Sequence, residues 1–102
     1  MSDIARLMEV ARTSASPRND TIPYVDGLGV IGGQLTCTMG NWEGQPTSYA
    51  YQWKRDAVNV GTNANTYTIV AGDSTHSMGC VVSATNPAGT TAAPLSNVVA
   101  VP

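Results

Sequence analysis

The sequence contains few of the residues from which catalytic and metal sites are usually built. Of its 102 residues, one is histidine, two are cysteine and only 12% are charged. A catalytic or metal-binding cluster needs several such side chains close together. The composition therefore argues against an enzyme, and it predicts no cofactor and no metal ion.

Strong charge of either sign is also missing. Five Lys and Arg residues stand against seven Asp and Glu residues, for a net charge of -2. Nucleic acids and anionic membranes attract proteins mainly through clustered positive charge. We therefore expect no nucleic-acid partner and no membrane partner.

No long apolar run opens the chain. Residues 1–20 carry three arginines and three acidic residues, and charges at this spacing interrupt both a secretion signal and a membrane span. We expect synthesis in a cytoplasm. The same segment holds six of the twelve charged residues of the whole chain, which separates it in composition from residues 21–102.

The opening segment shows the spacing of a short amphipathic helix. Four apolar residues recur on one helical face: Ile4, Leu7, Met8 and Ala11. Three helical turns are too few to be stable alone in water, so this face would need a surface on which to dock. The alternative is a frayed terminus. The polar residues 13–20, which include Pro17, indicate a linker.

From residue 21 onward the composition turns to Thr, Val, Ser, Gly and Tyr without helical periodicity. Short alternating segments between turn residues predict an all-β antiparallel sandwich. We expect an anchor segment with linker over residues 1–20 and one folded domain over residues 21–102. The predicted strands are Pro23–Asp26, Gln34–Thr38, Tyr49–Arg55, Val58–Val60, Thr66–Val70, Met78–Thr85 and Ser96–Val101.

Strand alternation predicts which side chains form the core. One face of each of three predicted strands carries Leu35 and Cys37, Tyr51 and Trp53, and Cys80 and Val82. The order Cys37, Trp53, Cys80 has separations of 16 and 27, which is the arrangement of immunoglobulin-like sandwiches. The two cysteines could form a long-range disulfide, although a reducing cytoplasm opposes one during synthesis.

Several motifs extend this pattern: Gly40-Asn41-Trp42-Glu43-Gly44, Tyr51-Gln52-Trp53-Lys54-Arg55-Asp56, Thr66-Tyr67-Thr68 and Cys80-Val81-Val82-Ser83-Ala84-Thr85-Asn86. Over residues 23–101 the chain resembles the bacterial and phage Ig-like domains. Two positions depart from the family pattern. Ala57 stands where the family often has a turn glycine, so another turn type is expected there. Met78 stands where antibody-type domains have the tyrosine of the tyrosine corner.

Three surface features have a structural alternative beside a functional one. His76 lies within four residues of an Asp and a Ser, but neighbouring residues point apart and do not form a triad, so we interpret it as a loop residue. Trp42 could form an aromatic platform with Tyr49 or Tyr67, but packing over the end of the sandwich is favoured. The loops Asn59–Asn65 and Asn86–Thr91 are candidates for contacts of their own.

The resemblance implies a non-enzymatic structural protein of a phage virion. A single domain behind a short amphipathic segment favours a capsid decoration protein on the exterior of the virion. In this hypothesis the opening segment docks on the lattice of the major capsid protein. The alternatives are an adhesion or carbohydrate-binding module that contacts glycans or the host cell surface, and a tail or fibre accessory protein.

Overall fold

The computed structural model describes residues 15–102, and within them the regular structure is antiparallel β-strand apart from one 3₁₀ turn, η1 (Ala71–Asp73). The predicted docking face of Ile4, Leu7, Met8 and Ala11 lies outside the described residues. The strands are β1 (Arg18–Thr21), β2 (Val25–Gly27), β3 (Gln34–Cys37), β4 (Asn41–Glu43), β5 (Ser48–Arg55), β6 (Val58–Val60), β7 (Thr66–Thr68), β8 (Ser77–Asn86), β9 (Gly89–Ala92) and β10 (Val99–Ala100).

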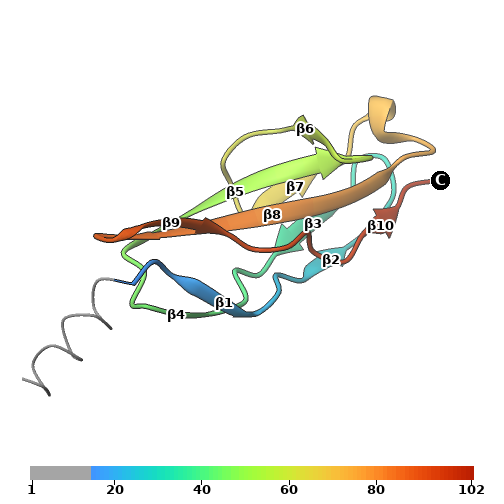
Figure 1. Ribbon diagram of the computed structural model, residues 1–102. Coiled ribbons are helices and arrows are strands. Elements are labelled where there is room, and N and C mark those ends of the chain that lie inside the picture. The colour runs from blue at the N-terminus through green and yellow to red at the C-terminus, as the bar shows by residue number, and fades with distance from the viewer. Residues whose placement is uncertain (1–14) are drawn as a thin grey trace, which may run out of the picture.

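Two sheets form the body of the domain, and their arrangement is compatible with a β-sandwich. One sheet has the order β2-β3-β7, and the other has the order β10-β8-β5-β6, with β9 pairing farther along β8. All strand pairs are antiparallel, and the longest pair, β5 with β8, runs through the centre (Figure 1). Strands β1 and β4 form a separate two-stranded ladder. The predicted all-β class is thus confirmed.

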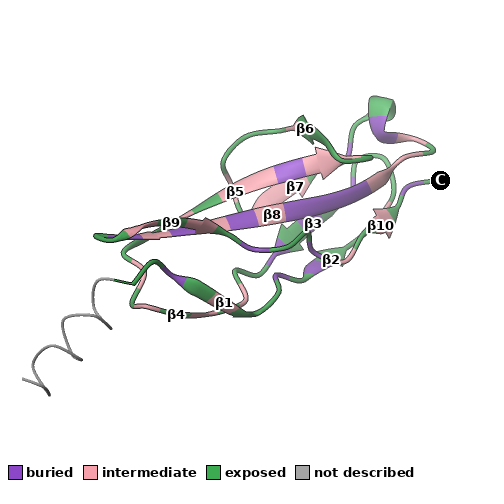
Figure 2. Ribbon diagram, viewed as in Figure 1, coloured by how far each residue is buried: buried purple, intermediate pink, exposed green. Residues whose placement is uncertain are grey.

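The core contains five of the six side chains that strand alternation predicted, while Tyr51 is only partly buried and packs against the core. Buried residues from both sheets meet between them, and Figure 2 shows this burial along β8 and in one band of β5 just before its arrowhead. Trp53 and Cys80 lie opposite each other in the β5–β8 register. The core residues are Val25, Leu35, Cys37, Trp53, Ile69, Met78, Cys80, Val82 and Val101, all less than 5% exposed.

Three strands were missed by the sequence. β1 begins at Arg18, inside the predicted linker, and pairs with β4, which overlaps the Gly40–Gly44 motif. β9 lies within the Asn86–Thr91 loop and forms a hairpin with β8. The linker prediction for residues 18–20 and the loop prediction for residues 89–91 were therefore wrong. Of the predicted final strand, only Val99–Ala100 pairs with β8.

The turn between β5 and β6 keeps the form that a glycine would favour. Asp56 has φ 48° and Ala57 has φ 69°, so both central residues lie in the left-handed region required by a type I′ hairpin. The expectation of another turn type was wrong, because Ala57 adopts the strained backbone. The following strand, β6, has the predicted bounds.

Candidate functional site

Cys37, Trp53 and Cys80 meet in the core as predicted, but they do not form a reactive site. The Trp53 ring is buried, and its Nε1 donates a hydrogen bond to the carbonyl oxygen of Ala64 at 2.8 Å. Cys37 and Cys80 are buried free thiols on the two facing sheets. Interaction with Cys37, followed by burial, raises the pKa of the Cys80 thiol, whereas interaction with Cys80 lowers the pKa of Cys37. Both thiols are buried, and a thiol that solutes do not reach is inert as a nucleophile.

His76 pairs with an aspartate that the sequence did not associate with it. Its Nδ1 lies 2.5 Å from Asp56 Oδ2, while the backbone N–H of Ser77 donates to Asp56 Oδ1 at 2.9 Å. The hydrogen bond from His76, and then that from Ser77, lowers the pKa of Asp56. Among residues 15–102, no Ser or Thr hydroxyl hydrogen-bonds to the His76 ring. The arrangement therefore ties two turns together and lacks the nucleophile of a triad.

Asp73 lies three residues before His76 in the sequence, but its carboxylate bonds to residues other than His76. It is fully buried and accepts hydrogen bonds from Arg55 at 3.1 Å, Tyr67 at 2.8 Å and the backbone N–H of Val70 at 2.9 Å. Burial and the bond to Asp73 raise the pKa of Tyr67 to about 12. The spacing of Tyr67 and Asp73 in the sequence was the available signal, but it did not reveal that Asp73 links β5, β7 and η1.

Trp42 is held in place by two contacts and is only half-exposed. Its Nε1 donates to the carbonyl oxygen of Met39 at 2.7 Å, and its ring meets Tyr49 edge-on with centroids 6.4 Å apart. The ring also packs against the core. Tyr67 does not join this pair; it stacks on Trp53 at 5.5 Å instead. Trp42 therefore has the geometry of a packing residue.

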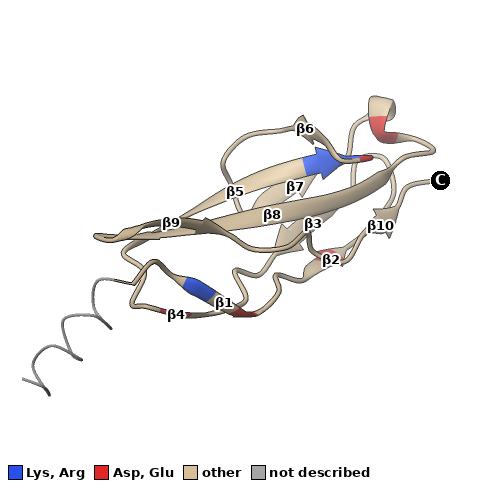
Figure 3. Ribbon diagram, viewed as in Figure 1, with Lys and Arg blue, Asp and Glu red and all other residues tan. Residues whose placement is uncertain are grey.

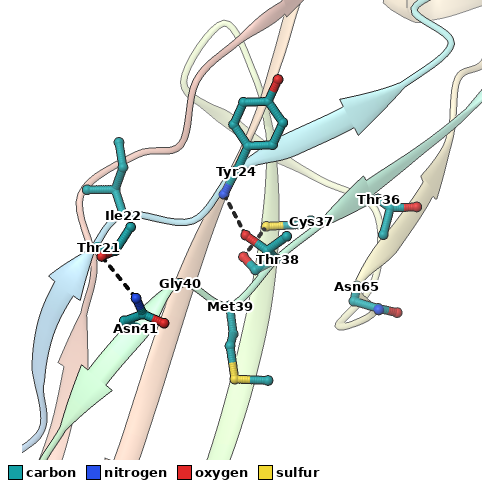
Figure 4. Close-up of a pocket in the computed structure, with 10 residues that line it drawn as sticks. All are labelled: Thr21, Ile22, Tyr24, Thr36, Cys37, Thr38, Met39, Gly40, Asn41 and Asn65. Carbon is teal, nitrogen blue, oxygen red and sulfur yellow. Dashed lines mark hydrogen bonds between the residues drawn. The ribbon is translucent and has the colours of Figure 1, made fainter.

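A groove that the sequence did not indicate opens beside Trp42. It has a volume of about 520 Å³ and follows the points where β1 gives way to β2 and β3 gives way to β4 (Figure 4). We call it the Tyr24 groove. Its lining is Thr21, Ile22, Tyr24, Thr36, Cys37, Thr38, Met39, Gly40, Asn41 and Asn65.

A second hollow lies where the described chain enters the sandwich. This entry pocket, of about 570 Å³, is lined by Ala15, Ser16, Arg18, Glu43 and Gly44. Arg18 bridges Glu43 at 2.6 Å and Asp20 at 3.0 Å across its exposed rim. The amide of Asn86, which is 4% exposed, donates to the carbonyl oxygens of Ala15 and Gly44, each at 2.8 Å. Asn86, which was predicted to lie in a loop, is therefore buried and holds the backbone at Ala15 by a hydrogen bond.

In the described part of the chain, no group of three His, Cys, Asp or Glu residues is placed to bind a metal ion. Residues 15–102 also contain no helix of the length and apolarity needed to cross a membrane. Comparison with known proteins found no matching family model, no matching curated protein and no matching solved structure.

Proposed function

We propose that this chain is a non-enzymatic structural protein of a phage virion. In this proposal it is a capsid decoration protein on the outer surface of the particle. Residues 1–14 dock on the lattice of the major capsid protein, and the remainder of the chain displays an Ig-like domain. The proposal combines the motif resemblance with the way the chain enters its domain.

The strand arrangement supports the Ig-like assignment. In an Ig-like domain, the sheet β2-β3-β7 would take the place of the ABE sheet, and the sheet of β9 and β10, β8, β5 and β6 that of the GFCC′ sheet. The core brings Cys37 of β3 and Cys80 of β8 beside the Trp53 indole of β5. These three residue types in this order and placement are the features on which the resemblance rests.

The observation that carries the docking hypothesis is the position of the two ends of the domain. Ala15 is clamped by Asn86 at the end that holds the β8–β9 hairpin, while Pro102 lies at the opposite end (Figure 1). A segment docked through Ile4, Leu7, Met8 and Ala11 would therefore leave the long axis of the sandwich free to project outward. Repetition over a capsid lattice would give many weak contacts a high combined affinity.

Co-sedimentation with capsids built from the major capsid protein of the same phage tests this function. The full chain should bind, whereas Leu7→Asp with Met8→Asp should abolish binding, since charge on the apolar face opposes burial. Arg6→Ser changes a neighbouring residue outside that face and should bind like the full chain. Unchanged binding by the double variant would refute the anchor, and failure of the full chain to bind would refute the capsid partner.

A further inference from the structure

We propose that the Tyr24 groove binds a neutral oligosaccharide. The Tyr24 ring supplies an apolar face for the sugar, and free side-chain amide and hydroxyl groups of the groove bond to its hydroxyls. This site is separate from the proposed capsid anchor. It also differs from the Trp42 platform considered in the sequence, because Trp42 is engaged by Met39 and Tyr49.

The absence of charge in the groove defines the class of ligand. None of its ten lining residues is Asp, Glu, Lys, Arg or His. Figure 3 shows few charged residues along the ribbon of residues 15–102. One of them, Asp20, directly precedes the lining residue Thr21 and is paired with Arg18 at 3.0 Å. Phosphate and carboxylate ligands are bound most strongly by cationic side chains, and hard metal ions are bound largely through carboxylate oxygens. A polar ligand suited to this lining is therefore uncharged and rich in hydroxyl groups.

Three polar side chains of the groove have unused bonding capacity. The Tyr24 hydroxyl, the Thr36 hydroxyl and the Asn65 side-chain amide form no side-chain hydrogen bond within residues 15–102, and all three residues are exposed. Together they offer both donors and acceptors. A sugar hydroxyl can donate and accept at once, so it matches this mixed set better than a purely donating or purely accepting ligand.

Apolar surface lies beside these polar groups. Tyr24 is 55% exposed, Ile22 is 47% exposed and Met39 is 41% exposed. Figure 4 shows Tyr24 and Met39 extending from opposite sides of Thr38, with Thr36 and Asn65 to one side. Aromatic rings combine a large contact area with a polar tip. The groove can therefore cover the C–H face of a sugar ring while its amide and hydroxyls bond to the edge.

The groove is built into the backbone before any ligand arrives. Tyr24 N–H donates to Thr38 Oγ1 and Thr38 N–H donates to the Tyr24 carbonyl oxygen, both at 2.9 Å. Gly40 has φ 77°, and a Cβ there would lie 2.1 Å from the Thr21 carbonyl oxygen. Only glycine permits this close approach of the two backbone segments. Because the floor is fixed, binding requires little ordering of the protein.

The volume is also suitable. About 520 Å³ lies within the usual range for sites that hold small molecules. The site is a shallow surface groove with exposed aromatic and amide groups, which suits part of an extended glycan. Many copies on one particle would strengthen weak individual contacts.

The test is an amide NMR titration of the full chain with a panel of uncharged oligosaccharides of glucose, mannose, galactose and N-acetylhexosamine. At least one should shift the amides of Tyr24, Thr38 and Asn65 selectively. Tyr24→Ala should weaken that binding about tenfold, since it removes the largest apolar contact. Tyr24→Phe should retain most of the affinity, and Asn65→Ala should reduce it several-fold.

Leu28→Ala is the matched control, because Leu28 is 69% exposed and does not line the groove. It should bind like the unmodified chain, and thermal melts of all variants should coincide. Absence of groove shifts with every glycan of the panel would overturn the proposal, as would unchanged binding by Tyr24→Ala. Equal or better binding of sialylated or phosphorylated glycans would contradict a neutral ligand. Capsid binding by Tyr24→Ala should stay intact, so this proposal and the anchor fail independently.

Discussion

At the scale of single residues, two of the four non-glycine residues with positive φ in the described part of the chain, Asp56 and Ala57, form the β5–β6 turn. Ala57 has φ 69°, a conformation that costs residues with a Cβ about 1–2 kcal/mol but costs glycine little. Glycine also loses about 0.5–1 kcal/mol more conformational entropy on folding. We expect Ala57→Gly to raise the free energy of unfolding by about 0.5–1 kcal/mol, measured by denaturant titration.

Ala88 provides the control for this substitution. It is an exposed turn residue between β8 and β9 and, unlike Ala57, has no positive φ. Ala88→Gly gains no relief of strain and bears the entropic cost alone, so it should lower stability by about 0.5–1 kcal/mol. If Ala57→Gly were as destabilising as Ala88→Gly, the turn would not store the strain assigned to it.

The pairing of Asp56 with His76 makes a second residue-scale prediction, which concerns pH. The pKa of Asp56 is lowered by His76 and Ser77, so the folded state favours the carboxylate. The resulting stabilisation is present above the ordinary pKa of about 3.9 and is lost as the pH falls through the lowered value. The melting temperature of Asp56→Asn should therefore be below that of the unmodified chain at pH 6. The difference between the two should shrink toward zero near pH 2; a constant difference would contradict the assignment.

At the scale of elements, β3 and β8 bring two cysteines into the same core cluster from facing sheets. Cys37 and Cys80 are free and buried, and each Sγ donates to the carbonyl oxygen of the following residue, Thr38 at 3.2 Å and Val81 at 3.8 Å. If they are oxidised without strain, closing this loop should add about 4 kcal/mol in the chain-entropy model. Mild oxidant should raise the melting temperature and lower the mass by two hydrogens.

Reductant should reverse both changes, and Cys37→Ser should show neither of them. An oxidised product with a lower melting temperature would mean that the bridge distorts the two sheets. Because both thiols are buried, partial unfolding should speed the reaction.

Strands whose sequences alternate apolar and polar residues were predictable, including β6 (Val58–Val60), which has no buried residue, whereas β1 and β9 lack this alternation and were not predicted. Trp53 and Cys80 were identified because apolar residues alternate along β5 and β8, which fixes the inward face. Arg18–Thr21 of β1 contains no large apolar residue, so its sequence shows no such alternation, and the strand is largely exposed. Its pairing with β4 joins residues 20 to 25 positions apart, and local pattern carries no information about that contact.

The Tyr24 groove could not be predicted from the sequence for a related reason. The Tyr24 groove forms where two neighbouring segments of the chain both leave one strand and enter the next. One segment passes from β1 to β2 near Pro23, and the other passes from β3 to β4 near Gly40. Each break resembles an ordinary turn signal when considered alone. Trp42 was singled out as a rare aromatic, whereas the exposed ring belongs to Tyr24, whose neighbours in the sequence form no distinctive motif.

At the scale of the whole molecule, residues 15–102 are expected to fold without the opening segment. They contain the buried core cluster around Trp53, and in this range no buried side-chain nitrogen or oxygen lacks a hydrogen-bond partner. A chain beginning at Ala15 should therefore melt within about 2 °C of the full chain, because a stability change of less than about 0.5 kcal/mol shifts the midpoint little. Capsid binding, by contrast, should be lost with residues 1–14.

A slightly longer truncation separates the domain from its anchor. A chain beginning at Arg18 also loses buried Pro17 and the Ala15 carbonyl oxygen that accepts from the Asn86 amide. Asn86 is nearly inaccessible to water, so removing one of its acceptors should destabilise the domain by about 1–3 kcal/mol. Circular dichroism melts of the two truncated chains measure the difference. Equal melting temperatures would show that the domain begins at β1, and an equally large loss in both would show that residues 1–14 contribute to the fold itself.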